Sequence, residues 1–230
     1  MVKEWRDALV HLFYPKLCFG CNNDLIHDDQ MLCMECIAAL GYTQFEGMRN
    51  NPVEKLYWGR VNLQFAASTF YYIEETPLQR IVHHIKYRQE PALGRYMGEL
   101  MGINILSVFK DLETALCIPM PLHPKKEYTR GYNQATLLCE GIFKTTGVAY
   151  NEKVLVRNQN TRTQTKKSRK ERWENVASVF EVIDHQAVAN KNIVLVDDVI
   201  TTGASTEACA TTLLEHGAKS VGVCSLAFTL

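Results

Sequence analysis

The residues best suited to chemistry lie together near the end of the chain, where residues 192–206 read NIVLVDDVITTGAST. Two carboxylates, Asp197 and Asp198, are followed by a run of small and hydroxyl-bearing residues. Small residues let backbone N–H groups approach an anion closely, and a helix that starts after them directs its positive end to the same point. The acids repel phosphate and suit a polyol or a metal-bound group. Phosphate beside hydroxyls describes a ribose 5-phosphate.

A buried strand must position these acids. The unbroken apolar run 193–196 is typical of a central parallel strand, and open α/β sheets bind ligands at the carboxyl ends of their strands. A helical pattern follows, as far as Glu215. The Walker B strand of an ATPase also ends in acids, but it needs a Gly-Lys-Ser/Thr loop, and none of the 13 glycines is followed by lysine.

A second anion site is predicted after an apolar strand at residues 115–120. Residues 121–134 read PLHPKKEYTRGYNQ, and three cations, Lys125, Lys126 and Arg130, line this expected loop. The RGYNQ segment begins a helix, where backbone donors are free. The alternative is a basic loop that only contacts solvent.

A third basic segment covers residues 158–172, NQNTRTQTKKSRKER. From Arg157 to Arg172 it holds seven Lys or Arg and one acid. Three interpretations stay open: a mobile solvated loop, a lid that places cations on a bound pyrophosphate and excludes water, and a nucleic-acid patch. The last lacks interleaved aromatic residues before Trp173.

Two Cys-x-x-Cys pairs stand near the start of the chain, Cys18 with Cys21 and Cys33 with Cys36, eleven residues apart. Two such pairs complete a tetrahedral site that suits zinc, and four thiolates leave no open position, which predicts a structural metal. A redox pair and buried core cysteines are the alternatives.

The composition is that of a globular protein that is neither strongly basic nor strongly acidic. The 230 residues are 47% hydrophobic and 22% charged, with a net charge of zero, so no global field favours nucleic acid or membrane. No apolar run reaches the length of a membrane span, and the first residues lack the layout of a secretory signal. We expect a cytoplasmic protein whose cysteines are thiols or metal ligands.

The remaining pattern predicts strands that alternate with helices after residue 60, and hence a parallel sheet flanked by helices. Thr76 and Pro77 start one helix, whose predicted buried stripe is Leu78, Ile81, Val82 and Ile85. Its polar residues His83, His84, Lys86 and Arg88 lie mostly on other faces. We expect a zinc-ribbon module and linker over residues 1–50 and an α/β domain over 51–230. The other expected elements are helices at 2–13, 37–40 and 92–109, strands at 61–73, 154–157, 177–183 and 220–226, and a turn at 184–191.

In these motifs the chain resembles the ComF branch of the type I phosphoribosyltransferases, over nearly its whole length. Both cysteine pairs, the segment YYIEETPLQRIVHHIKYRQ at 71–89, the PLH-basic-RGYNQ segment and the stretch 193–205 occur in the usual order. The resemblance implies binding of phosphoribosyl pyrophosphate (PRPP) with Mg²⁺. It also implies that the segment before the core forms a hood over the acceptor substrate.

Roles of single residues follow from the same resemblance. Asp197 and Asp198 bind the ribose hydroxyls, and Lys125 and Arg130 stabilise the leaving pyrophosphate. The other predicted PRPP-binding residues are Lys126, Gly131, Val199, Ile200, Thr201, Thr202, Gly203, Ala204 and Ser205. In and just after the basic segment the family pattern is matched by Thr161, Gln164, Arg172 and Asn175, whereas Lys166 and Lys167 replace Gly-Leu.

Two functions remain open. One is an enzyme that transfers ribosyl 5-phosphate to an acceptor that the sequence does not identify, since no residue stands out as a general base. The other is a non-catalytic protein that senses PRPP or a nucleotide and docks a helicase or single-stranded DNA. The resemblance connects either one with DNA uptake in competence, by analogy, and it leaves homo-oligomerisation open.

Overall fold

The structure is a computed structural model that describes residues 11, 13, 15–25, 30–110, 112, 115–157 and 179–229. The expected helix at 2–13 and the basic segment 158–172 lie almost wholly outside these residues. Among the described helices, none is both long and apolar enough to cross a membrane.

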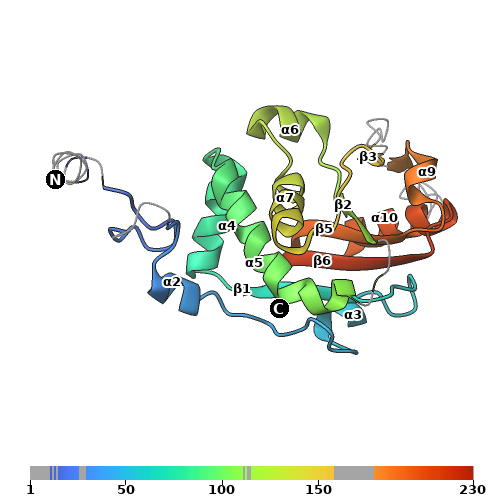
Figure 1. The fold of residues 1–230 in the computed structure, drawn as a ribbon, viewed down its shortest axis with the longest axis horizontal. Coiled ribbons are helices and arrows are strands. Elements are labelled where there is room, and N and C mark those ends of the chain that lie inside the picture. Colours follow the sequence, from blue (N-terminus) through green and yellow to red (C-terminus); the bar gives the residue numbers. More distant parts are fainter. Residues whose placement is uncertain are drawn as a thin grey trace, which may run out of the picture.

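Four parallel strands form the central sheet, in the order β1 (Ala66–Tyr72), β6 (Ser220–Thr229), β5 (Asn192–Ile200) and β2 (Ala115–Pro119). Figure 1 shows these strands running side by side through the middle of the molecule. The predicted parallel α/β sheet is confirmed. Because the strands are parallel, their carboxyl ends meet at one edge.

Strand β5 has neighbours on both sides, which explains its apolar sequence. Residues 192–196 are buried, whereas Asp197, Asp198 and Val199 are half-buried. The strand continues to Ile200, so both acids are part of the strand, close to its carboxyl end. They therefore have a rigid backbone.

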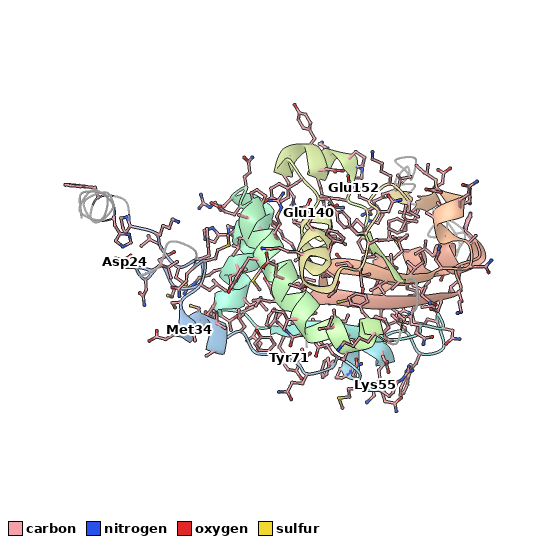
Figure 2. The ribbon with its side chains drawn as sticks, in the orientation of Figure 1. Asp24, Met34, Lys55, Tyr71, Glu140 and Glu152 are labelled. Atoms are coloured by element: carbon pink, nitrogen blue, oxygen red, sulfur yellow. The ribbon has the colours of Figure 1, made fainter. Side chains whose placement is uncertain are left out.

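In the described part of the chain, five helices are longer than five residues: α4 (Pro77–Tyr87), α5 (Pro91–Lys110), α6 (Pro124–Arg130), α7 (Gln134–Thr146) and α10 (Ala204–Glu215). Helices α5 and α7 pack closely on each other and on the sheet, while α10 packs on β5 and β6. Charged side chains border the α5–α7 contact: Arg95 contacts Glu140, and Lys144 lies 2.6 Å from Glu99. Figure 2 labels Glu140 on α7.

Helix α4 has the predicted apolar stripe, because Leu78, Ile81, Val82 and Ile85 are its buried residues. Thr76 occupies the N-cap position, as predicted. Its hydroxyl donates to the carbonyl of Ile73 and makes no capping hydrogen bond.

The region between β2 and β5 differs most from expectation. The predicted basic loop is mainly the helix α6, whose N-cap His123 accepts a hydrogen bond from the Lys125 amide. The short strands β3 (Leu155–Arg157) and β4 (Phe180–Val182) form a separate antiparallel pair and do not join the central sheet. The expected turn at 184–191 contains the short helix α9 (His185–Val188).

The N-terminal part folds against the sheet. Helix α2 (Met34–Ala38) begins three residues earlier than predicted, because the Cys33 side chain caps it by accepting from the Cys36 amide. The expected linker runs along β1, where the Thr43 amide donates to Thr69 and the Tyr71 amide to Gly41. Short helix α3 (Pro52–Lys55) follows. A domain boundary at residue 50 stays a prediction.

Candidate functional site

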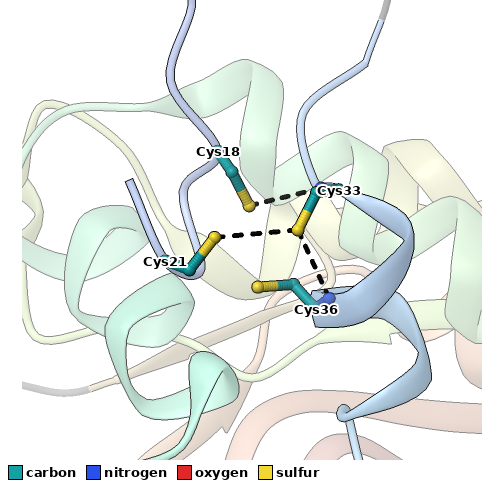
Figure 3. Close-up of side chains that lie close together, drawn as sticks. All are labelled: Cys18, Cys21, Cys33 and Cys36. Carbon is teal, nitrogen blue, oxygen red and sulfur yellow. Dashed lines mark hydrogen bonds between the residues drawn. The ribbon is translucent and has the colours of Figure 1, made fainter. Parts of the chain in front are cut away.

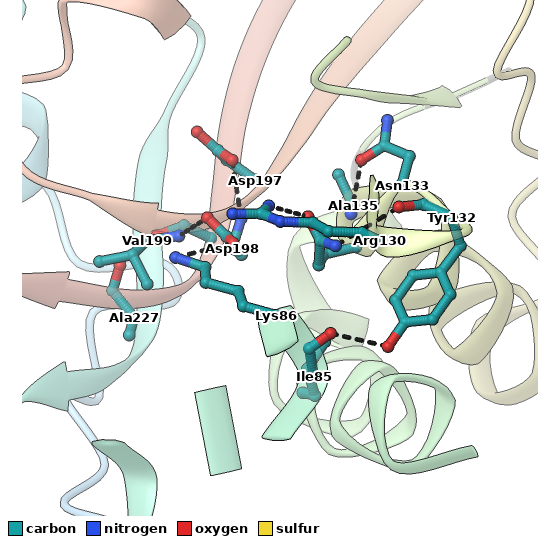
Figure 4. Close-up of polar contacts among 12 residues, drawn as sticks. Ile85, Lys86, Arg130, Tyr132, Asn133, Ala135, Asp197, Asp198, Val199 and Ala227 are labelled. Atoms are coloured by element: carbon teal, nitrogen blue, oxygen red, sulfur yellow. Dashed lines mark hydrogen bonds and ion pairs between the residues drawn. The ribbon is translucent and has the colours of Figure 1, made fainter. Parts of the chain in front are cut away.

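The acid pair lies at the carboxyl edge of the sheet, as predicted. The Asp198 amide donates to Asp197 Oδ1 at 2.8 Å, and the Val199 amide donates to Asp198 Oδ1 at 2.6 Å. Lys86 reaches across from α4, and its Nζ lies 3.0 Å from Asp198 Oδ2 (Figure 4). Lys86 was expected on an outer face of its helix, and its ion pair with this acid is a feature that the sequence analysis missed.

The two acids differ in their electrostatic surroundings. Burial, together with the like charge of Asp198, raises the pKa of Asp197 from 3.8 to about 8. Asp198 has the Lys86 ammonium as its counter-ion. Oxygen donors of this kind are the ligands that Mg²⁺ prefers, so the chemistry of the pair fits a Mg²⁺ ion.

The raised pKa of Asp197 predicts that this acid lowers stability at neutral pH. Between pH 3.8 and about 8 the folded protein keeps a proton that the unfolded chain loses, so the free energy of unfolding falls as pH rises through this window. We expect Asp197→Asn to remove this pH dependence. The free energy of unfolding of the variant minus that of the wild type should then be larger at pH 8 than at pH 4, by on the order of 1–2 kcal/mol. Urea unfolding at both pH values measures the effect. A difference between variant and wild type that does not change with pH contradicts the prediction.

The loop after β5 has the geometry of an anion site. Thr201, Thr202, Ala204 and Ser205 are exposed, and Gly203 has a φ of +71°. Gly203 is the N-cap of the 12-residue helix α10, and no side-chain hydrogen bond caps this end. The first N–H groups of a helix have no partner within it, so they are free to bind a phosphate here.

Tyr57 packs against this loop, next to Gly203 and Thr206. Its ring is 2% exposed, and its hydroxyl lies 2.6 Å from Thr206 Oγ1. A Cβ atom at Gly203 would come within 3.0 Å of the same ring. Burial raises the pKa of Tyr57 to about 12, which keeps the phenol neutral. This contact was not predictable from local sequence patterns, because 149 residues separate Tyr57 from Thr206.

Helix α6 brings the predicted pyrophosphate-binding cations together around a hollow of about 440 Å³. Arg130 donates to Gln134 Oε1 at 2.5 Å, and its guanidinium lies over the Tyr87 ring at 5.5 Å. Gly131 ends the helix with a φ of +80°. The residues that line the hollow are Lys86, Tyr87, Gln89, Lys125, Lys126, Thr129 and Arg130.

Lys86 connects this hollow with the acid pair, since it lines the hollow and also contacts Asp198 (Figure 4). The structure thus places the two sequence-predicted anion sites and the acid pair at the same edge of the sheet. The predicted lid residues Thr161, Gln164, Arg172 and Asn175 lie outside the described part of the chain.

The four N-terminal cysteines form a compact cluster (Figure 3). Their Sγ atoms all lie within 4.8 Å of one another, and those of Cys21 and Cys33 are 3.7 Å apart. Four sulfurs around zinc, each about 2.3 Å from the metal, are separated by about 3.8 Å. A disulfide would need about 2.05 Å. The cluster can therefore hold a zinc ion, as predicted.

Backbone amides stabilise a thiolate in the cluster. Those of Gly20 and Cys33 donate to Cys18 Sγ, at 3.3 and 3.2 Å. Burial opposes ionisation of Cys18, but these and a further amide donor lower its pKa to about 7. Burial and the neighbouring thiols raise the pKa of Cys36. A cation would stabilise all four thiolates together.

The cysteine cluster also contacts the helix that carries Lys86. Arg80 of α4 donates to the Gly20 carbonyl at 2.9 Å, and the rings of Phe19 and His84 meet edge to face at 5.3 Å. A Cβ atom at Gly20 would collide with Cys36 Sγ.

Comparisons with known proteins agree with this arrangement. The family model described as "Phosphoribosyl transferase domain" matches residues 146–229. "Competence protein ComFC" of Bacillus subtilis is 37% identical over 98% of this chain and 88% of its own length. "Competence protein F" of Haemophilus influenzae is 25% identical over 95% of this chain and 93% of its own. "DNA utilization protein YhgH" of Salmonella typhi is 30% identical over 67% of this chain and 68% of its own.

Solved structures resemble the fold alone. The allosteric regulatory enzyme of purine biosynthesis gives a TM-score of 0.43 at 21% identity, over 62% of this chain and 29% of that enzyme. A hypoxanthine phosphoribosyltransferase of Staphylococcus aureus gives 0.37 at 9% identity, over 59% and 63%.

The sheet is parallel, and the match to the phosphoribosyl transferase family model ends in β6. Together they define an α/β domain of the phosphoribosyltransferase type. The chain belongs to the ComF family of competence proteins, whose members ComFC and competence protein F match almost its full length.

Proposed function

We propose that this protein binds PRPP with Mg²⁺ at the carboxyl edge of the sheet and transfers ribosyl 5-phosphate to a nucleophile, with release of pyrophosphate. One observation carries the proposal: an acid pair lies between an uncapped helix N-terminus and a hollow lined by cations. Each of the three suits a different part of PRPP, namely the ribose hydroxyls, the 5-phosphate and the pyrophosphate.

Each group then has a distinct task. Asp197 and Asp198 bind the ribose hydroxyls and hold the sugar in one orientation. The amides at the start of α10, with the hydroxyls of residues 201–205, bind the 5-phosphate. As the bond from C1 to the pyrophosphate oxygen breaks, its electron pair leaves with the pyrophosphate. Lys125, Lys126 and Arg130 stabilise the negative charge that develops there.

Asp197 and Asp198 are also the residues that would hold Mg²⁺, together with the ligand's own oxygens. The ion would supply a Lewis acid that neutralises charge on the pyrophosphate. If Asp198 binds Mg²⁺, its ion pair with Lys86 must break. The Lys86 ammonium can then move into the cation-lined hollow, which Lys86 also lines.

The cation-lined hollow is tested by comparing two ligands that differ only in the pyrophosphate. In calorimetry with Mg²⁺, Lys125→Gln/Arg130→Gln is expected to weaken PRPP binding at least about tenfold, because it removes two charge-assisted contacts. Binding of ribose 5-phosphate should stay unchanged, and Lys110→Gln, at an exposed position of α5, should change neither. Equal weakening of both ligands contradicts the assignment, and absence of PRPP binding to the wild type contradicts the proposed function.

A non-catalytic role in which the protein senses PRPP and docks a helicase or single-stranded DNA is the second proposal. It is favoured by the cysteine cluster that packs on α4, the same helix that carries Lys86. Turnover distinguishes the two, since only the enzyme releases pyrophosphate. Gel shifts with single-stranded DNA that persist at about 0.2 M salt would support direct DNA binding, because contacts made only through phosphates weaken steeply there.

A further inference from the structure

A second hollow, of about 360 Å³, lies along α4 beside the proposed PRPP site. We call it the α4 groove. It shares Lys86 and Tyr87 with the cation-lined hollow, and Lys86 extends from its wall to Asp198. A molecule in the α4 groove therefore lies next to the acid pair and beside the pyrophosphate position. The lining residues are Tyr72, Gln79, Arg80, Val82, His83, His84, Lys86 and Tyr87.

The α4 groove favours a negatively charged occupant. None of its eight lining residues carries a carboxylate, whereas Arg80 and Lys86 carry positive charge. Arg80 uses one Nη to bind the Gly20 carbonyl, at 2.9 Å, so other N–H groups of its guanidinium remain for a ligand. A carboxylate accepts such donors in pairs. A cationic amine would meet repulsion from both side chains.

The walls of the α4 groove suit a flat ring. Tyr72 extends from the carboxyl end of β1, and the rings of His83 and Tyr87 pack on each other at 4.9 Å. Val82 adds an apolar surface, and Gln79 offers its Nε2 donor, while its Oε1 accepts from the Glu75 amide at 3.0 Å. A hollow of this size holds a small molecule.

His84 lines the groove without adding charge. Its Nδ1 atom is buried and has no hydrogen-bond partner among the described residues. Burial lowers the pKa of this imidazole, so it is neutral at pH 7. Arg80 therefore provides the positive charge that selects the ligand, because Lys86 is paired with Asp198.

Building on the proposed function, we infer that the acceptor is a small heteroaromatic carboxylate that binds in the α4 groove with its carboxylate on Arg80. A ring nitrogen of the acceptor attacks C1 of the ribosyl group with its lone pair and forms the new C–N bond. The C1–O bond breaks, and its electron pair leaves with the pyrophosphate. Where the attacking nitrogen carries a proton, that proton leaves to solvent through the open side of the groove.

Matched ligand pairs test this inference. Nicotinate and nicotinamide differ only at the carboxyl group, as do orotate and uracil, which lacks it. Binding is measured by ligand-observed NMR with the whole protein, with and without PRPP and Mg²⁺, and transfer is measured as pyrophosphate release. We expect at least one carboxylate to bind at least about tenfold more tightly than its uncharged partner and to give release.

A variant locates the site. Arg80→Gln should remove the preference for the carboxylate. Its zinc content and Tm show whether the Gly20 contact was lost as well, and Gln79→Ala is a second groove variant that leaves this contact intact. Equal binding within each pair by the wild type overturns the inference, even where PRPP binds. A carboxylate preference without PRPP binding would instead leave the groove as a carboxylate site and refute the proposed transfer.

Discussion

Replacement of Cys36 by serine is expected to abolish zinc binding and to unfold the cysteine cluster, leaving the α/β domain folded. Structural zinc in small modules contributes about 10–16 kcal/mol of binding free energy, and that energy is folding energy where the surrounding core is small. In the described part of residues 15–40, the buried apolar side chains other than the cysteines are Leu25, Leu32 and Leu40. Three leucines make a small core, so we expect the order of the cluster to depend on the metal that holds the four thiolates together.

Two measurements check this result. Zinc released per chain, detected with a chromogenic chelator, should be one equivalent for the wild type and well under one for Cys36→Ser. Limited proteolysis should then cut residues 30–40 of the variant faster, with the sheet still protected. Cys139→Ala is the matched control, because Cys139 is buried in α7 and does not belong to the cluster. Full zinc content in Cys36→Ser, or none in the wild type, contradicts a four-thiolate site.

Gly98→Ala is expected to destabilise the protein by about 2–3 kcal/mol, although alanine favours a helix by about 1 kcal/mol over glycine. A Cβ atom at Gly98 would collide with the carbonyl group of Leu138 in α7, which is backbone and cannot rotate away. Gly141 makes the reciprocal approach, since its Cβ atom would collide with the backbone of Arg95 in α5. The two helices must therefore separate to admit either methyl group.

Gly94→Ala is the matched control in the same helix. The three atoms nearest to its added Cβ all belong to the side chain of Leu137, and the closest, Cδ1 at 2.8 Å, can move away in another rotamer, whereas at Gly98 the closest atoms are backbone. We expect the midpoint of urea unfolding to fall clearly more for Gly98→Ala than for Gly94→Ala. Equal midpoints would show that the contact between α5 and α7 adapts more easily than its geometry indicates.

The elements that follow from local pattern were predicted well. The apolar run before Asp197 defined the central strand, because only a strand covered on both faces is apolar throughout. The stripe on α4 was also predicted, since the 3.6-residue period places its four apolar residues on one side. Because open α/β sheets bind ligands at the carboxyl ends of their strands, the acid pair was also predicted at the ligand-binding edge.

Features that depend on tertiary contact were not predictable in this way. Lys86 does not belong to the apolar stripe of its helix, and only the packing of α4 brings it to Asp198. Tyr57 carries no motif, yet it supports the loop at Gly203. Helix α6 was expected to be a basic loop, but Pro124 stands at its first helical turn, where proline is favoured.

The acid pair and its surroundings are tested most directly by calorimetry with PRPP and Mg²⁺. We predict measurable binding to the wild-type protein, and none to Asp197→Asn/Asp198→Asn in protein whose Tm shows that it is folded. Unchanged binding of PRPP by this double variant would contradict the assignment of the ribose to the end of β5.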